Sequence, residues 1–184
     1  ALLDTDTDGA RWLRDSFALY SAEKDMETAK RTLRQWADMP AAMVGSIAVD
    51  VWAYFWQLVA MQVLDKGGNT FRQWGPAKIS VKKLYDPLKA AKKAGKHICL
   101  TAHTKDDIRV DESGGKTDIS KVGQKADTEA MLNDLLDVHL RMCVDFKKDT
   151  RWFETVKCRP QRDFKPLLPS RIDIPRYERQ LVYP

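Results

Sequence analysis

The sequence predicts a mixed α/β fold in which a mainly parallel sheet lies between two layers of helices and is followed by an antiparallel hairpin. Three short segments, residues 1–5, 45–49 and 97–102, are almost wholly apolar, which is typical of parallel strands buried on both faces. Helical segments alternate with these strands along the chain, as in other parallel sheets. With 184 residues, 43% of them hydrophobic, the chain is long enough to bury a substantial core.

The first half of the chain supplies two of the expected strands and the helix between them. After the strand at residues 1–5, residues 9–20 have a mixed character. A helix is expected from Ser21 to Met39, with Ser21 as its N-cap and Pro40 directly after its end. The second strand, residues 45–49, comes next and is directly followed by Asp50.

Two further helices are expected between the second and third strands. Residues 51–65 are apolar on most sides and contain neither Gly nor Pro, so they predict a buried helix that Gly67 and Gly68 end. Residues 76–94 predict an amphipathic surface helix. The lysines on its polar side are expected to form a solvated surface: Lys82, Lys83, Lys89, Lys92, Lys93 and Lys96.

After the third strand the chain becomes less regular. Residues 104–127 are polar and contain almost no large apolar groups, which predicts a long mobile loop. Residues 135–144 and 152–158 alternate apolar and polar side chains and predict a hairpin. We expect a core domain over residues 1–160 and a surface tail over residues 161–184, which contain four prolines.

Composition excludes several classes of protein. No uninterrupted apolar segment reaches 18 residues, and the basic and apolar regions of a secretory signal are missing, so we expect a cytoplasmic protein, in the host cell if it is phage-encoded. The three cysteines are odd in number and far apart, which indicates reduced thiols. The net charge of +5 fits either a polyanionic partner or an ordinary solvated surface. Because the chain opens at Ala1 within an apolar segment, we expect a fragment of a longer protein.

Polar residues follow the three expected parallel strands. They are Asp4 and Asp6 after the first strand, Asp50 after the second, and His103 after the third. Ligands of parallel sheets gather at the carboxyl ends of the strands. A carboxylate at such a strand end, as in Asp50, can hold Mg²⁺ through water beside the phosphates of a nucleotide, and the cation makes the partly buried charge tolerable.

The neighbouring motifs resemble those of RecA-like P-loop ATPases, of the RecA/RadA recombinase and phage AAA-domain type. "LLDTD" resembles the family strand that ends in Asp-x-Glu, which implies that Asp6 orients the attacking water, although Asp is one methylene shorter than Glu. "ICLTAHTK" resembles the next core strand and implies that His103 senses the γ-phosphate. The resemblance implies ATP and Mg²⁺ as cofactors, with Asp50 and Asp4 at the cofactor site.

Further positions are implied by the same resemblance, which covers residues 1–160. "ETVKCRP" is similar to a late strand whose cations, here Lys157 and Arg159, reach the nucleotide of a neighbouring subunit in a ring or filament. The segment after His103 corresponds to a loop that contacts single-stranded DNA. Its cationic residues, which are equally compatible with a solvated surface of mixed charge, are Lys105, Arg109, Lys116 and Lys121.

The phosphate-binding motif G-x-x-x-x-G-K-[ST] is not found in this sequence. Gly115, Lys116 and Thr117 imitate its end, but Val110 stands where the first glycine is needed. We therefore predict a DNA-associated ATPase that is inactive as this fragment. A non-catalytic nucleic-acid-binding scaffold derived from such an ATPase is the alternative. A helicase or nucleotide kinase is less consistent, since Val51 follows Asp50 where helicases carry a second acid.

Overall fold

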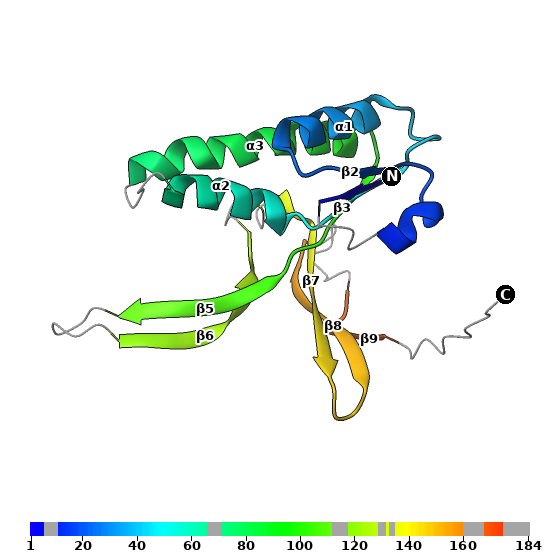
Figure 1. Cartoon of the computed structure of the whole chain (residues 1–184). Coiled ribbons are helices and arrows are strands. Elements are labelled where there is room, and N and C mark those ends of the chain that lie inside the picture. The colour runs from blue at the N-terminus through cyan, green and yellow to red at the C-terminus, as the bar shows by residue number, and fades with distance from the viewer. Residues whose placement is uncertain are drawn as a thin grey trace. The chain divides into compact units, whose positions relative to one another are not determined.

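The computed structural model describes residues 1–5, 11–65, 71–111, 118–128, 132, 135–159 and 168–174. Contacts divide the chain into two compact units, Ala1–Glu129 and Ala130–Pro184, so the expected core of residues 1–160 includes parts of both. The first unit contains a four-stranded parallel sheet, three α-helices and a hairpin, and the second contains a three-stranded antiparallel sheet (Figure 1). The predicted mixed α/β class with a parallel sheet is therefore confirmed.

The parallel sheet has the strand order β2-β1-β3-β4. Three of its strands match the predicted ones: β1 (Leu2–Asp4), β3 (Ser46–Asp50) and β4 (His97–Leu100). The edge strand β2 (Tyr20–Ala22) was not predicted, because three residues are too few to show a period. The side chains of Leu3, Ile47 and Val49 are 0% exposed, which explains why β1 and β3 are so apolar in sequence.

The three helices are α1 (Met26–Asp38), α2 (Ala53–Asp65) and α3 (Phe71–Lys93), and they lie together on one side of the sheet (Figure 1). Helix α3 contacts both α1 and α2. The core beneath them includes Trp52, which is 0% exposed and stacks on Tyr85 with ring centroids 5.2 Å apart. The described residues thus supply one helical layer, and the three-layer arrangement stays a prediction.

Helix α1 begins later than its sequence suggests. Ser21 belongs to β2, so its prediction as the N-cap is wrong. Asp25 is the N-cap, and its carboxylate accepts hydrogen bonds of 2.8 Å from both the backbone N–H and the hydroxyl of Thr28. These bonds lower the pKa of Asp25 below its ordinary value. Both residue types are favourable N-caps, and only the position of the first helical turn decides between them.

Lys96 does not belong to the solvated lysine surface predicted for α3. Its side chain is 4% exposed, and its Nζ donates hydrogen bonds of 2.5 Å to the carbonyl oxygens of Trp36 and Met39. These are carbonyls at the C-terminal end of α1, where the helix leaves carbonyl groups without intrahelical donors and where a cation is favourable. Lys96 therefore caps α1 from a position far along the chain.

The polar segment after β4 is a hairpin, so the prediction of a mobile loop over residues 104–127 is wrong. Strands β5 (Thr104–Asp111) and β6 (Asp118–Ala126) pair antiparallel. Backbone hydrogen bonds hold them together, and cross-strand ion pairs join Lys121 to Asp106 at 2.6 Å and Lys125 to Asp107 at 2.5 Å. A strand pair held this way exposes both faces and therefore lacks the hydrophobic alternation on which the sequence prediction depended.

The second unit is an antiparallel sheet in the order β7-β8-β9. Strands β7 (Val138–Asp145) and β8 (Thr150–Cys158) confirm the predicted hairpin. Strand β9 (Arg171–Ile174) pairs with β8 and lies within the segment expected to be a surface tail. The guanidinium of Arg171 on β9 lies 4.5 Å from the ring centroid of Trp152 on β8, which is a cation–π contact between the two strands.

Candidate active site

The carboxyl ends of β1, β3 and β4 meet at one edge of the parallel sheet. Asp4 and Asp50 are register partners on adjacent parallel strands, so their side chains lie on the same face of the sheet. Pairing continues past the strands, since the N–H of Thr5 donates to the carbonyl of Asp50 at 2.7 Å and the N–H of Trp52 to the carbonyl of Thr101 at 2.8 Å. The structure therefore brings together the ends of the three predicted strands.

Asp4 lies inside this edge. Its side chain is 1% exposed, and its Oδ2 accepts a 2.7 Å hydrogen bond from the hydroxyl of Tyr20 on the neighbouring strand β2. Burying a carboxylate is unfavourable unless hydrogen-bond donors or cations compensate the lost hydration. The Tyr20 hydroxyl is one such compensation, and it comes from the edge strand β2.

Asp50 is half-buried at the end of the central strand β3, and its Oδ1 accepts a hydrogen bond from the hydroxyl of Thr101. The backbone that follows is fixed by Thr5, whose Oγ1 donates to the carbonyl of Val51 and accepts from its N–H, both at 2.7 Å. The Asp50–Val51 peptide bond is cis. The two hydrogen bonds of Thr5 hold the backbone next to Asp50, and the Thr101 hydroxyl orients one oxygen of its carboxylate.

Thr101 is a residue of the candidate site that sequence reasoning missed. The third strand ends at Leu100, so Thr101 is the first residue beyond it, whereas His103 lies two residues further along and is exposed. The available signal was the first polar side chain after the apolar segment "HICL". The sequence prediction selected the histidine, whereas the Thr101 hydroxyl is the group that contacts Asp50.

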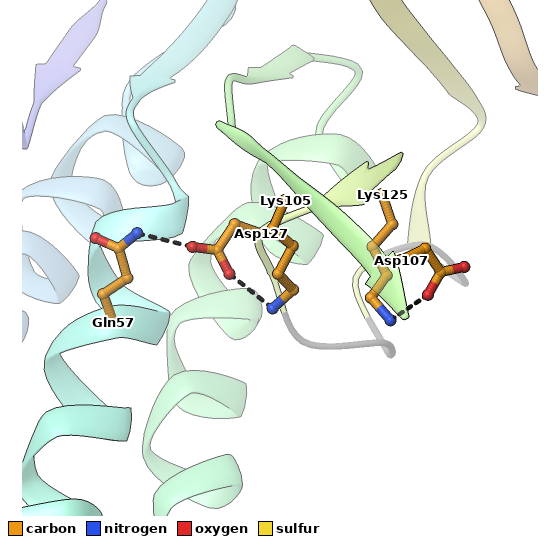
Figure 2. Close-up of polar contacts among 5 residues, drawn as sticks. All are labelled: Gln57, Lys105, Asp107, Lys125 and Asp127. Atoms are coloured by element: carbon orange, nitrogen blue, oxygen red, sulfur yellow. Dashed lines mark hydrogen bonds and ion pairs between the residues drawn. The ribbon is translucent and has the colours of Figure 1, made fainter. Parts of the chain in front are cut away.

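His103 stands where the chain leaves the sheet and enters the hairpin. Its carbonyl accepts a 2.7 Å hydrogen bond from the N–H of Asp127, which closes the base of β5 and β6. Figure 2 shows that the carboxylate of Asp127 links two elements: Oδ1 accepts from Lys105 Nζ at 2.7 Å, and Oδ2 accepts from Gln57 Nε2 at 2.8 Å. Because Gln57 lies on α2, the base of the hairpin is joined to the helix that follows Asp50.

The electrostatics of this link are set by Asp127. Burial by itself raises the pKa of the Asp127 carboxyl, but the hydrogen bonds from Lys105 and Gln57 and the nearby positive charges of Lys105 and His103 outweigh it, so the pKa is lowered. The carboxylate therefore stays ionised over a wider range of pH than a free aspartate. We refer to Gln57, Lys105 and Asp127 as the hairpin latch.

The other predicted site residues are distributed over the chain. Asp6 and Lys116 lie outside the described residues, as does the side chain of Arg109. Lys105 belongs to the hairpin latch, and Lys121 is paired with Asp106. Lys157 and Arg159 belong to the second unit, where Arg159 Nη1 lies 3.3 Å from Asp137 Oδ1 and Lys157 is the register partner of His139.

The candidate site contains few ligands for a metal ion. Within the described parts of the chain, no three side chains of His, Cys, Asp or Glu are grouped closely enough to hold one. Mg²⁺ retains several waters and requires only one or two protein carboxylates when phosphates supply the rest. Asp50 is one such carboxylate at this strand edge, whereas Asp4 is 1% exposed behind it. The described donors would therefore fit a water-mediated Mg²⁺ beside phosphates and do not fit a metal held by protein ligands alone.

Comparison with known proteins identified no relative of this chain. Neither a family model, nor a curated protein, nor a solved structure matches the chain. Among the helices that the structure describes, none is both long and apolar enough to cross a membrane.

Proposed function

We propose that the chain forms the nucleotide-binding core of a DNA-associated ATPase of the RecA-like type, which uses ATP and Mg²⁺ and assembles into a ring or filament. The observation that carries this proposal is Asp50, which ends the central parallel strand in register with Asp4 and is hydrogen-bonded to Thr101. A single oriented carboxylate at this edge of a parallel sheet is what a water-mediated magnesium site beside a triphosphate requires.

Each residue then has a defined task. Asp50, held by Thr101, binds Mg²⁺ through water, and Asp4 adds a second negative charge behind it. Asp6 orients the water that attacks the γ-phosphate, and His103 responds to the charge on that phosphate. The Mg²⁺ ion supplies neutralisation of the charge that develops on the phosphate oxygens.

The hairpin latch supports a connection between the nucleotide site and the hairpin. Helix α2 begins at Ala53, just after Asp50, and β5 begins at Thr104, just after Thr101. The hydrogen bonds of Asp127 to Gln57 and Lys105 join these two segments a second time. A displacement at the Asp50–Thr101 pair therefore has a short path to the hairpin, in which Lys105, Arg109, Lys116 and Lys121 are the proposed contacts to single-stranded DNA.

The proposed trans contacts are compatible with the second unit. The Arg159–Asp137 ion pair joins side chains that are 50% and 52% exposed. Such surface pairs contribute only about 0–1 kcal/mol, so a neighbouring subunit's phosphate can replace Asp137 at little expense of stability. Lys157 and Arg159 would thus complete an adjacent nucleotide site in an assembled ring or filament.

The test is ATP turnover by the full-length natural protein, with and without single-stranded DNA. We expect Asp50→Asn to lower turnover by about 100-fold or more, because losing about 3 kcal/mol of charge stabilisation corresponds to that factor. The matched control is Asp65→Asn, an exposed aspartate at the end of α2, which should leave turnover unchanged. Equal turnover by Asp50→Asn and wild type would refute the assignment. DNA binding without any turnover would indicate the non-catalytic scaffold instead.

A further inference from the structure

Helix α3 carries a row of lysines on its exposed surface. Lys78, Lys82, Lys89 and Lys93 are all exposed, and their spacing of four, seven and four residues places them within a narrow strip along the helix. We call these four residues the α3 lysine row. At 1.5 Å per residue the row is about 22 Å long.

The positive charge of the chain is concentrated in this helix. Helix α3 contains seven Lys or Arg residues and one acidic residue, Asp86, whereas the whole chain has a net charge of only +5. The rest of the chain is therefore close to neutral. Lys82, Lys89 and Lys93 form no ion pair with any residue that the structure describes. A surface kept soluble by mixed charge would carry more acids between its lysines.

The hairpin β5–β6 has the opposite character. Its two strands contain four cationic and four acidic residues, so they carry no net charge. Three of its lysines already lie against aspartates, with Nζ–O distances between 2.5 and 2.7 Å: Lys105, Lys121 and Lys125. A phosphate must therefore displace a carboxylate at each of these positions, whereas Lys82, Lys89 and Lys93 form no such ion pair with the described residues.

We propose that the α3 lysine row binds the phosphate backbone of a nucleic acid without reading its sequence. This inference rests on the nucleic-acid association in the proposed function but not on ATP hydrolysis. Neutralising backbone phosphates with lysines releases condensed counterions, which drives sequence-independent binding. The aromatic residues of α3 whose side chains are described, Trp74 and Tyr85, are half-buried and buried, so the row offers no exposed ring on which bases could stack.

An anionic membrane fits this surface less well. A helix that binds at a membrane interface inserts its apolar side among the lipids. The apolar side of α3 is already packed in the core, with Val81, Leu84, Leu88 and Ala91 between 0% and 6% exposed. Ile79, which is 57% exposed, is the one large apolar side chain described on α3 that would remain beside the lysines, and it offers little surface to insert among lipids. Nucleic-acid phosphates are thus the occupant that the charge pattern and the packing favour.

The experiment measures binding of the full chain to labelled duplex and single-stranded DNA across a salt series, without ATP or Mg²⁺. We expect Lys82→Gln/Lys89→Gln to weaken binding at least about tenfold at low salt and to reduce the log–log salt slope for duplex by about 1.8, since each lost phosphate contact changes it by about 0.9. The matched control is Lys147→Gln/Lys148→Gln, which removes two exposed lysines from the turn between β7 and β8 and should change both quantities much less.

Three results would overturn the inference. One is wild-type DNA binding by Lys82→Gln/Lys89→Gln, and another is an equal loss in the Lys147→Gln/Lys148→Gln control. The third is row-dependent binding to phosphatidylserine vesicles with no binding to either DNA. Circular dichroism of both variants checks that they fold. Because no nucleotide is present, a negative outcome here leaves the ATP-turnover result to decide the proposed function separately.

Discussion

Replacing Lys96 by methionine should destabilise the first unit, although the substitution nearly keeps the volume of the side chain and its unbranched shape. Lys96 is 4% exposed, and its ammonium group donates to the carbonyls of Trp36 and Met39 at the end of α1. Methionine cannot donate to either. The change therefore removes two charge-assisted hydrogen bonds and a cation at the negative end of the helix.

The magnitude follows from the surroundings of the two carbonyls. The hydrogen bond to the carbonyl of Trp36 is buried, so leaving this carbonyl without a donor costs about 1–3 kcal/mol of stability. The carbonyl of Met39 is only part-buried, so water can replace much of its hydrogen bond. Methionine also avoids the desolvation of a buried ammonium group, which offsets part of the loss. We expect a net decrease of about 1–3 kcal/mol in the free energy of unfolding, or about 2–12 °C in Tm for a protein of this size.

Urea denaturation followed by circular dichroism measures this difference. The control is Lys83→Met, which removes an exposed lysine from α3 and should change the free energy of unfolding by less than about 0.5 kcal/mol. If Lys96→Met and Lys83→Met unfold at the same urea concentration, the buried ammonium is not capping α1 and the reasoning is wrong.

Two further predictions concern charged groups. Burial, together with the positive charges of Lys157 and Arg141, lowers the pKa of His139 below 6.5, so the folded state resists protonation. Stability should therefore be present above pH 6.5 and decrease as the pH falls below it, and thermal unfolding of His139→Gln should lack this component. In the hairpin latch, Asp127→Asn should accelerate amide hydrogen exchange in β5 and β6 more than Asp107→Asn does, because Asp107 pairs with Lys125 within the hairpin and lies further from its base. The lowered pKa of Asp127 means that its stabilisation is present above pH 3.8 and is lost as the pH falls further, so exchange in wild type should approach that of Asp127→Asn only in strong acid. Equal exchange in the two variants at neutral pH would exclude a special role for the latch.

Buried apolar elements were the predictable part of this fold. The strands β1 and β3 are apolar because the fold buries them, and their positions were predicted to within a few residues. The position of α2 was predicted equally well, but only one side of this helix is buried, since Met61 and Leu64 are 61% and 57% exposed. Elements held mainly by backbone pairing and charge were missed. The hairpin β5–β6 and the edge strand β9 expose many polar side chains, so hydrophobic periodicity carries little information about them.

The candidate site likewise has a part that the sequence predicts and a part that it does not. That Asp4 and Asp50 meet was predictable, because strand ends of a parallel sheet share an edge. The partners that orient them were not, since the Tyr20 hydroxyl comes from an unpredicted strand and Thr101 was passed over in favour of His103. Likewise, nothing in the sequence around Lys96 indicates that it caps a helix some 60 residues earlier. Contacts of this kind depend on tertiary packing, which local patterns do not contain.

The contrast between hairpin and helix bears on how a nucleotide could control binding to DNA. If the hairpin alone held DNA, its ion pairs would have to break at every binding event. If the α3 lysine row supplies the permanent, sequence-independent attraction, the hairpin is free to respond to the nucleotide through the latch at Asp127. Loss of the row should then weaken DNA binding with and without ATP alike, whereas loss of the latch should remove only the difference that ATP makes. If loss of the latch instead weakened DNA binding with and without ATP, and loss of the row removed only the effect of ATP, the hairpin, and not α3, would anchor the DNA.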